Sequence, residues 1–243
     1  MSRKREIATI SLSMLDLLSG ALGAMMILYI AVPKAKENMI EQGPAATHMT
    51  SMQNSKSEMV PAHLGFKFKG KKIVFILDTS GSMEKEERIG QVKAGLKFFL
   101  TSLSDEYHID LIHYPGSLGE PYNSLFGELK KFTPEIKTQI FKMLYQIEPR
   151  GPTPTRDALS FALTHYQGLS DIVLLTDGAP TIGMSYNADD IGGILKTVQI
   201  LNRDKTQISG LGIGRKFLDD SNHPKFQFLF NLAKQNGGFF YGL

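Results

Sequence analysis

The chain has 243 residues and a formal net charge of +3, from 27 Lys and Arg against 24 Asp and Glu. So small a basic excess argues against nucleic acid as a partner. Hydrophobic residues make up 42% of the chain, which supplies a core and excludes a wholly disordered protein. There is no cysteine, so disulfides, thiolate zinc sites and a cysteine nucleophile are excluded.

An apolar segment follows a short basic start of the chain. Residues 1–9 are basic and polar, whereas residues 10–33 are apolar except for small and hydroxyl residues, one aspartate and a final proline. A helix needs roughly 20 residues to cross a hydrocarbon core of about 30 Å. We therefore predict a transmembrane helix over 10–33. The basic residues before it predict a cytoplasmic N-terminus, with the remaining chain periplasmic or extracellular. A cleaved secretory signal and a buried soluble helix are the alternatives.

The one aspartate of this segment, Asp16, has two interpretations. A carboxylate at the centre of a membrane helix costs roughly 2.5–3.5 kcal/mol, so such a residue is a functional candidate. Alternatively, Ser13 and Asp16 have the spacing of a capping box, in which the carboxylate stabilises the start of a helix. The spacing alone does not distinguish these two roles.

The segment also resembles a known membrane helix. Residues 15–18, Leu-Asp-Leu-Leu, followed by apolar residues up to Pro33, are similar to the single span of ExbD/TolR- and MotB-like proteins. These are the B subunits of ion-driven motors in the bacterial inner membrane. The resemblance implies that Asp16 carries a proton or a sodium ion. It also implies a multi-spanning MotA/ExbB-like partner subunit and a homodimer within a larger complex.

The rest of the chain predicts a linker and one domain. Residues 34–65 are rich in Met, Ser, Gln and Asn and lack a strand-like block, which is typical of a linker. Strand and helix patterns alternate over 66–243, which predicts an α/β fold with a mostly parallel sheet, helices on both faces, and one edge hairpin near 107–132. The expected strands are 72–77, 107–113, 171–176, 206–213 and 238–242, and the expected helices are 88–103, 133–147, 156–166, 189–202 and 225–236.

Oxygen-bearing side chains follow two of these strands and lie on a third loop. The buried run 72–77 ends in Asp-Thr-Ser-Gly-Ser, and the run 171–175 ends in Thr-Asp-Gly. A Gly- and Pro-containing loop between them carries a threonine. Ligands of open α/β sheets bind beyond the carboxyl ends of the strands, so we expect these side chains to form one site. The candidate ligands are Asp78, Ser80, Ser82, Thr153 and Asp177.

Two carboxylates and three hydroxyls form a set of hard oxygen ligands, which suits Mg²⁺, with Mn²⁺ or Ca²⁺ as substitutes. If the hydroxyls bind the ion directly and the carboxylates act partly through water, the charge of the ion is incompletely neutralised, and an open position attracts a carboxylate of a partner. Such a site binds, but it supplies no nucleophile or general base. We therefore expect no enzymatic activity, and a metal-dependent hydrolase is the weaker alternative.

The same pattern resembles the von Willebrand factor A domain and its metal-ion-dependent adhesion site. The family's Asp-x-Ser-x-Ser is matched by Asp78, Ser80 and Ser82, its loop threonine by Thr153, and its third-loop aspartate by Asp177. The resemblance extends over residues 66–243. It implies a Mg²⁺ cofactor and a protein ligand that offers an acidic residue.

Other interpretations of these residues explain less of the pattern. Asp78 and Ser80 are also suitable N-cap residues for the next helix, but capping gives no role to Thr153 and Asp177. The Asp-Thr-Gly of aspartic proteases requires glycine where Ser80 stands. His108 and His113 are expected to be structural, and residues 84–88 to form a solvated first helical turn.

The two parts together predict a membrane-anchored protein that binds a partner through a divalent metal. The resemblance of the span implies the B-type subunit of an ion-driven motor in the bacterial inner membrane, with Asp16 as its ion carrier. The alternative is a membrane-anchored adhesion or chaperone-type module without ion translocation.

Overall fold

The computed structural model describes residues 67–242 except 216, 218 and 219. The predicted cytoplasmic segment, the predicted span with Asp16 and the predicted linker all lie outside the described residues. Within the described part of the chain, no helix is both long enough and apolar enough to cross a membrane.

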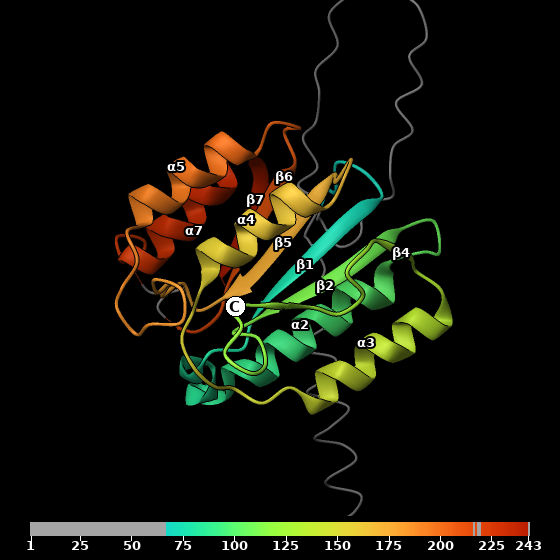
Figure 1. Ribbon diagram of the computed structural model, residues 1–243, viewed down its shortest axis with the longest axis horizontal. Helices are drawn as coiled ribbons and strands as arrows, with labels where there is room; N and C mark the ends of the chain where they lie inside the picture. The colour runs from blue at the N-terminus through green and yellow to red at the C-terminus, as the bar shows by residue number, and fades with distance from the viewer. Residues whose placement is uncertain (1–66, 216, 218–219, 243) are drawn as a thin grey trace, which may run out of the picture. The chain divides into compact units, whose positions relative to one another are not determined.

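The described residues form a central sheet whose strands run mostly parallel (Figure 1), as the sequence predicted. The strand order is β3-β2-β1-β5-β6-β7, and β4 also pairs with β2. The parallel strands are β1 (Lys72–Asp78), β2 (His108–Tyr114), β5 (Asp171–Thr176), β6 (Gln207–Gly212) and β7 (Gly237–Gly242). The two short antiparallel strands are β3 (Asn123–Ser124) and β4 (Lys130–Lys131), which lie in the region predicted as an edge hairpin.

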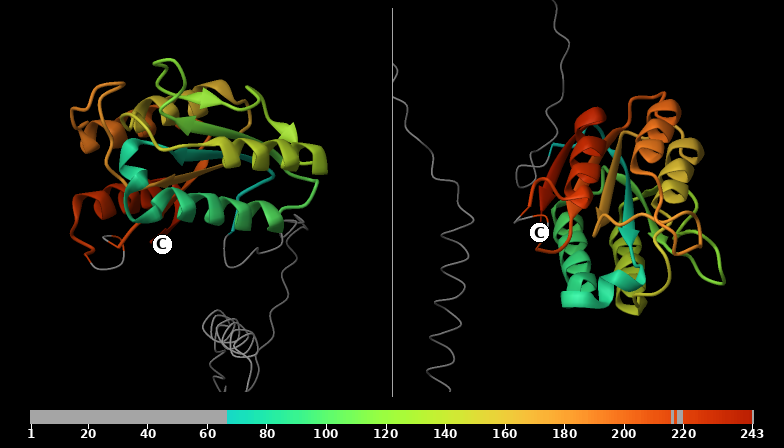
Figure 2. Two further views of the ribbon diagram at one scale, coloured as in Figure 1. Left: turned by 90° about the horizontal axis from the view of Figure 1, so that it is seen from below. Right: turned by 90° about the vertical axis from the view of Figure 1, so that its left-hand side faces the viewer.

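Helices cover both faces of this sheet. The α-helices are α2 (Arg88–Ser102), α3 (Pro134–Gln146), α4 (Thr155–His165), α5 (Ile191–Leu201) and α7 (Pro224–Gln235). In Figure 2, seen from below, α2 and α3 lie in front of the sheet. The core residues of α4, α5 and α7 pack on the opposite face. Each of these five helices begins and ends within two residues of its predicted bounds.

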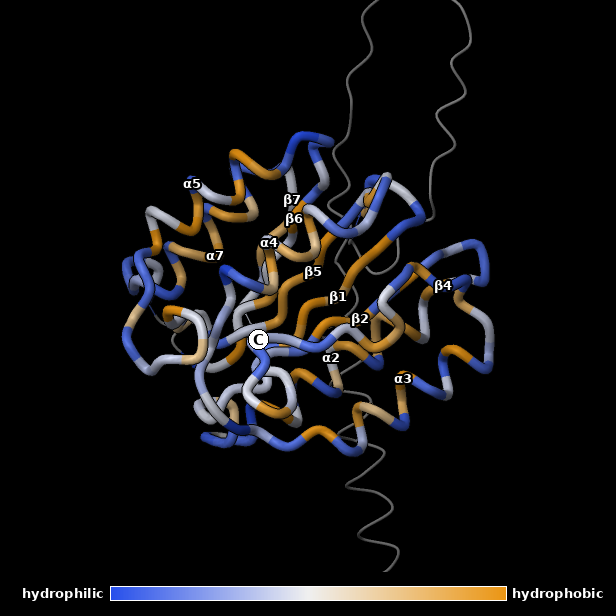
Figure 3. Tube along the Cα trace, in the orientation of Figure 1, coloured by the Kyte–Doolittle hydropathy of each residue, from blue (hydrophilic) through white to orange (hydrophobic). Residues whose placement is uncertain are grey.

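The alternation of side chains along β1 divides the core into two layers. Ile73, Phe75 and Leu77 pack with α2 and α3, whereas Val74 and Ile76 face α4, α5 and α7. All five side chains are fully buried, as expected for a strand covered by helices on both faces. Figure 3 shows the apolar strands at the centre and hydrophilic segments outside.

One local prediction was wrong. Residues 84–88 do not form the first turn of the long helix, because Gly81–Glu87 is a separate 3₁₀ helix, η1. Glu87 adopts a left-handed conformation with φ 54°, which interrupts the helical path. The α-helix begins only at Arg88, and this places Arg88 beside the carboxyl edge of the sheet.

Candidate metal site

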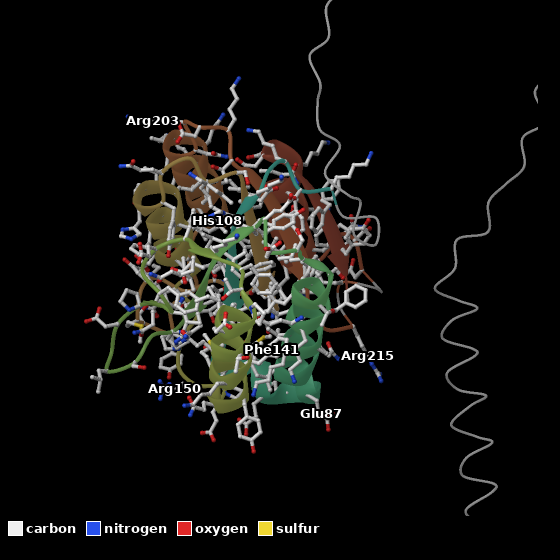
Figure 4. The ribbon with its side chains drawn as sticks, turned by 90° about the vertical axis from the view of Figure 1, so that its right-hand side faces the viewer. Glu87, His108, Phe141, Arg150, Arg203 and Arg215 are labelled. Atoms are coloured by element: carbon white, nitrogen blue, oxygen red, sulfur yellow. The ribbon has the colours of Figure 1, made fainter. Side chains whose placement is uncertain are left out.

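Three loops meet at the carboxyl edge of the sheet. We call them loop 1 (residues 79–82, after β1), loop 2 (residues 147–154, before α4) and loop 3 (residues 177–190, after β5). Figure 4 shows Glu87 and Arg150 at this end of the domain and Arg203 at the other. Because β1 and β5 are parallel neighbours, the loops that follow them begin side by side.

Backbone hydrogen bonds join loop 1 to loop 2. The Gly81 amide donates to the Gly151 carbonyl at 2.9 Å, and the Arg150 amide donates to the Thr79 carbonyl at 2.8 Å. Gly151 has a φ of +69°, and a Cβ there would lie 3.0 Å from the Pro115 ring, so glycine suits this position. The Ser80–Ser82 segment is thereby held against the loop that carries the predicted threonine ligand.

Loop 2 is joined to loop 3 through two threonines. The Thr153 amide donates to the Thr181 hydroxyl at 2.8 Å, and the Thr181 amide donates to the Thr153 carbonyl at 2.8 Å. Both backbone groups of Thr153 are therefore engaged, and its side chain is largely buried. The structure thus brings the loops of all five predicted ligands together at one edge.

Asp78 is fully buried and fixes the start of loop 1. One carboxylate oxygen accepts the Ser80 amide at 2.9 Å, and the other accepts the Thr176 hydroxyl at 2.5 Å. Burial, together with the negative charge of Asp177, raises the pKa of Asp78 to about 6, although these hydrogen bonds lower it in part. The protein alone therefore stabilises the ionised Asp78 carboxylate only incompletely, and a nearby cation would stabilise it further.

The hydroxyl oxygens of Ser80 and Ser82 lie 3.0 Å apart, at the same edge. Two hydroxyls this close can contribute to one coordination shell. Within the described ranges, no group of three or more His, Cys, Asp or Glu forms a metal site. A cation at this edge therefore depends on hydroxyl ligands as well as on the two carboxylates.

Asp177 has one satisfied and one unsatisfied oxygen. Its Oδ2 accepts hydrogen bonds from Arg88 Nη1 at 2.9 Å and from Lys225 Nζ at 3.0 Å. Its Oδ1 is buried and has no hydrogen-bond partner. A buried carboxylate oxygen without a donor is costly, so it is a suitable ligand for a cation. The donor set therefore fits a hard divalent ion such as Mg²⁺.

The sequence did not reveal either basic partner of Asp177. Arg88 was predicted on a solvated helical turn, but its side chain is only 13% exposed and pairs with Asp177. Lys225 lies 48 residues from Asp177 along the chain, in the first turn of α7. No local motif links residues so far apart, so these ion pairs became visible only in the folded structure.

The fold and site define an open α/β domain with a cluster of oxygen ligands at the carboxyl edge of its sheet. The family model for the von Willebrand factor type A domain matches residues 71–241. The chain belongs to this family.

Known relatives share the domain at low identity. The chain is 26% identical over 168 residues to the uncharacterized protein YfbK of Escherichia coli, covering 67% of this chain and 26% of that protein. It is 27% identical over 179 residues to the bovine inter-alpha-trypsin inhibitor heavy chain H3, covering 69% of this chain and 18% of that protein. The chain thus spans about a quarter or less of the curated relatives it matches.

Solved structures have the same fold. A von Willebrand factor type A protein from Catenulispora acidiphila superposes with a TM-score of 0.55 at 17% identity, covering 71% of this chain and 38% of that one. An aerotolerance-related membrane protein from Bacteroides fragilis superposes with a TM-score of 0.52 at 17% identity, covering 72% of this chain and 92% of that one.

Proposed function

We propose that this chain is a membrane-anchored von Willebrand factor A protein that binds a partner protein through a divalent cation. The cation would be held by Asp78, Ser80, Ser82, Thr153 and Asp177. The observation that carries the proposal is the buried, unpartnered Oδ1 of Asp177, at an edge where the loops of the other four residues also meet. Mg²⁺ is the expected ion, and Mn²⁺ or Ca²⁺ would substitute for it.

The residues of the site have separate tasks in this proposal. The two serine hydroxyls and the threonine offer neutral oxygens, while Asp78 orders loop 1 through the Ser80 amide. The bound ion would supply positive charge for a carboxylate of the partner. The site offers no nucleophile or general base besides its ligands, so we propose binding without catalysis.

Removing one basic partner of Asp177 should strengthen metal binding. Lys225→Met deletes an ammonium group that competes with the ion for the Asp177 carboxylate. Because like charges repel at a few ångströms in a partly buried site, we expect roughly tenfold tighter Mg²⁺ binding, measured by isothermal titration of the full-length chain. Lys234→Met, in the last turn of the same helix, is the matched control and should change nothing. Unchanged affinity in Lys225→Met would contradict the competition.

The second part of the proposal concerns the location of the protein in the cell, and it is based on the predicted membrane segment. We propose that the chain is the B-type subunit of an ion-driven motor in the bacterial inner membrane, as a homodimer beside a multi-spanning subunit. Asp16 would carry the proton or sodium ion. A protein described as an aerotolerance-related membrane protein has the same fold, so the fold is compatible with an anchored domain.

Asp16→Asn should abolish ion uptake by vesicles that contain the complete complex, because an amide neither releases nor takes up a proton or a sodium ion. The amount of the chain in the membrane fraction should stay normal. Ser13→Ala is the control for the capping alternative and should leave uptake intact. Full uptake with Asp16→Asn would remove the ion-carrying role.

The partners are tested by isolating the full-length chain in mild detergent with Mg²⁺ or with EDTA. We expect a multi-spanning protein under both conditions, because it would contact the span, and a second protein only with Mg²⁺. Absence of any multi-spanning protein would favour the alternative, an anchored adhesion or chaperone-type module.

A further inference from the structure

Four exposed hydrophobic side chains lie on loops at the metal-site edge. Leu118 is fully exposed, and Tyr186 is 79% exposed. Ile182 and Met184 are also exposed, although less so. We call these four residues the apolar collar. Exposed hydrophobic side chains that gather around a functional site are typical of protein interaction surfaces.

The collar comes from two loops that flank loop 2. Leu118 lies on the loop after β2, whose last residue, Tyr114, pairs with Asp78 in the sheet. The Arg150 guanidinium donates to the Ser117 hydroxyl at 3.3 Å, which joins that loop to loop 2. On the other side, the Thr153–Thr181 hydrogen bonds hold loop 3. The collar is therefore attached to the same loops that carry the metal ligands.

Loop 3 holds its part of the collar on a hydrogen-bonded hairpin. Thr181 and Ala188 form an antiparallel bridge, and the Ile182 amide donates to the Asn187 carbonyl at 2.9 Å. The Ser185 amide closes the tip on the Ile182 carbonyl at 3.0 Å. An ordered hairpin loses little conformational freedom on binding, which favours its use as a contact surface.

A cavity of about 400 Å³ opens beside the hairpin, between loop 3 and the start of α7. Its apolar walls include Pro180, Ala188, Ile191 and Pro224, and Tyr186 of the collar also lines it. Lys225, whose ammonium group contacts Asp177, forms another wall. The volume lies in the usual range of ligand pockets, roughly 300–1,000 Å³. Because Lys225 both lines the cavity and contacts Asp177, the cavity borders the candidate metal site.

The charged groups of the cavity are already used within the protein. Asp189 also lines it, but its carboxylate forms a two-point ion pair with Arg156, with distances of 2.9 and 2.6 Å. Lys225 is paired with Asp177. The cavity consequently presents mainly apolar surface to an incoming group.

We infer that the partner is a protein segment in which an acidic residue stands beside a large apolar residue. This inference rests on the proposed function: the carboxylate would bind the metal, and the apolar side chain would enter the cavity that Tyr186 of the collar lines. Exposed charges of both signs, Arg150, Glu120 and Glu148, surround the edge. A mixed polar rim suits a protein partner, whereas an anionic lipid surface would favour basic residues only.

The inference is tested with a phage library of random heptapeptides, selected on the full-length chain in Mg²⁺. We expect enriched peptides to contain Asp or Glu within two positions of Phe, Leu, Ile, Met or Trp, and EDTA to prevent the enrichment. The chain has no tryptophan, so a tryptophan placed at the apolar position of the best peptide reports binding by its fluorescence alone. Its emission should shift to shorter wavelength as the indole leaves water.

Matched variants then separate the cavity from the metal. The double variant Ile182→Ser and Tyr186→Ser should weaken peptide binding roughly tenfold or more, because buried apolar anchors dominate such contacts. Its Mg²⁺ affinity should equal that of the unaltered chain. Tyr145→Ser, at a similarly exposed tyrosine on α3, should bind the peptide normally.

Any other result of the selection would overturn the inference, and each of these results has a different meaning. Metal-dependent peptides that share only the acidic residue would remove the role of the cavity and leave the proposed function intact. Apolar peptides that bind equally well in EDTA would contradict the metal-dependent function as well. No enrichment by a chain that binds Mg²⁺ normally would exclude a peptide ligand. Self-association that the double variant abolishes would assign the collar to a second copy of the chain, and vesicle binding lost in it would assign the collar to lipid.

Discussion

Asp78→Asn should abolish measurable Mg²⁺ binding and at the same time stabilise the metal-free protein. The amide cannot supply the negative charge that a hard divalent ion requires, and loss of the carboxylate that neutralises the ion and orders loop 1 should cost roughly 100-fold in affinity. The asparagine side chain would be as well packed as the aspartate, but it would not carry a buried charge. Isothermal titration measures the first effect and thermal unfolding the second.

The stabilising effect of Asp78→Asn on the metal-free protein should depend on pH. In the folded, metal-free chain, burial and Asp177 raise the pKa of Asp78 from 3.8 to about 6. The folded state therefore binds this proton more tightly than the unfolded state does. Asp78 should thus cause the free energy of unfolding to fall as the pH rises from about 4 to about 6. The Asp78→Asn variant should lack this contribution of Asp78 to the decline.

A surface aspartate provides the matched control for both effects. Asp105 is 71% exposed, and its nearest ion pair, to Lys131, is long at 3.8 Å. Asp105→Asn should change neither Mg²⁺ affinity nor the decline with pH. If Asp78→Asn bound Mg²⁺ like the unaltered chain, Asp78 would be a structural capping residue and the proposed site would be wrong.

Asp110→Ala should strongly destabilise the folded domain. The Asp110 carboxylate is fully buried on β2 and accepts four hydrogen bonds. The donors are the Leu111 amide at 2.6 Å, the Ser124 hydroxyl at 2.7 Å, the Tyr166 hydroxyl at 2.8 Å and the Phe126 amide at 3.1 Å. Alanine would leave these buried donors without their charged acceptor, and we expect a loss of about 3 kcal/mol or more.

Denaturant unfolding of the full-length chain measures this loss. Tyr166→Phe removes only one of the four donors and should cost about 1 kcal/mol. Asp110→Asn keeps the shape of the side chain and one carbonyl acceptor, so its effect should lie between the two. A loss in Asp110→Ala no larger than in Tyr166→Phe would mean that the network contributes little to the stability of this edge of the sheet.

The fold was predictable because its central strands are continuous apolar runs. β1 and β5 are covered on both faces, so all residues between their polar ends are hydrophobic, and each ends directly in a polar loop. The helices α3 and α5 carry the capping residues Thr133 and Asp190, which mark their starts. These signals are local in the sequence, and for that reason the predicted and observed bounds agree closely.

The interactions that the sequence did not reveal are those between distant residues. Arg88 and Asp177 are 89 residues apart, and Tyr166 and Asp110 are 56 residues apart. Asp110 lies among apolar residues of β2. Its role as a hydrogen-bond acceptor could not be predicted, because its donors Ser124 and Tyr166 are distant in the sequence. The η1 helix was also missed, because the left-handed conformation of Glu87 has no sequence signal. The ligand loops were predicted, but the basic groups that share Asp177 were not.

The most direct test of the central claim is a crystal structure of the full-length chain grown with Mn²⁺, in which anomalous scattering locates the ion. We expect one anomalous peak at the carboxyl edge, roughly 2.0–2.6 Å from the hydroxyl oxygens of Ser80 and Ser82 and next to Thr153 and Asp177. A structure with bound Mn²⁺ elsewhere on the protein and none between these loops would contradict it.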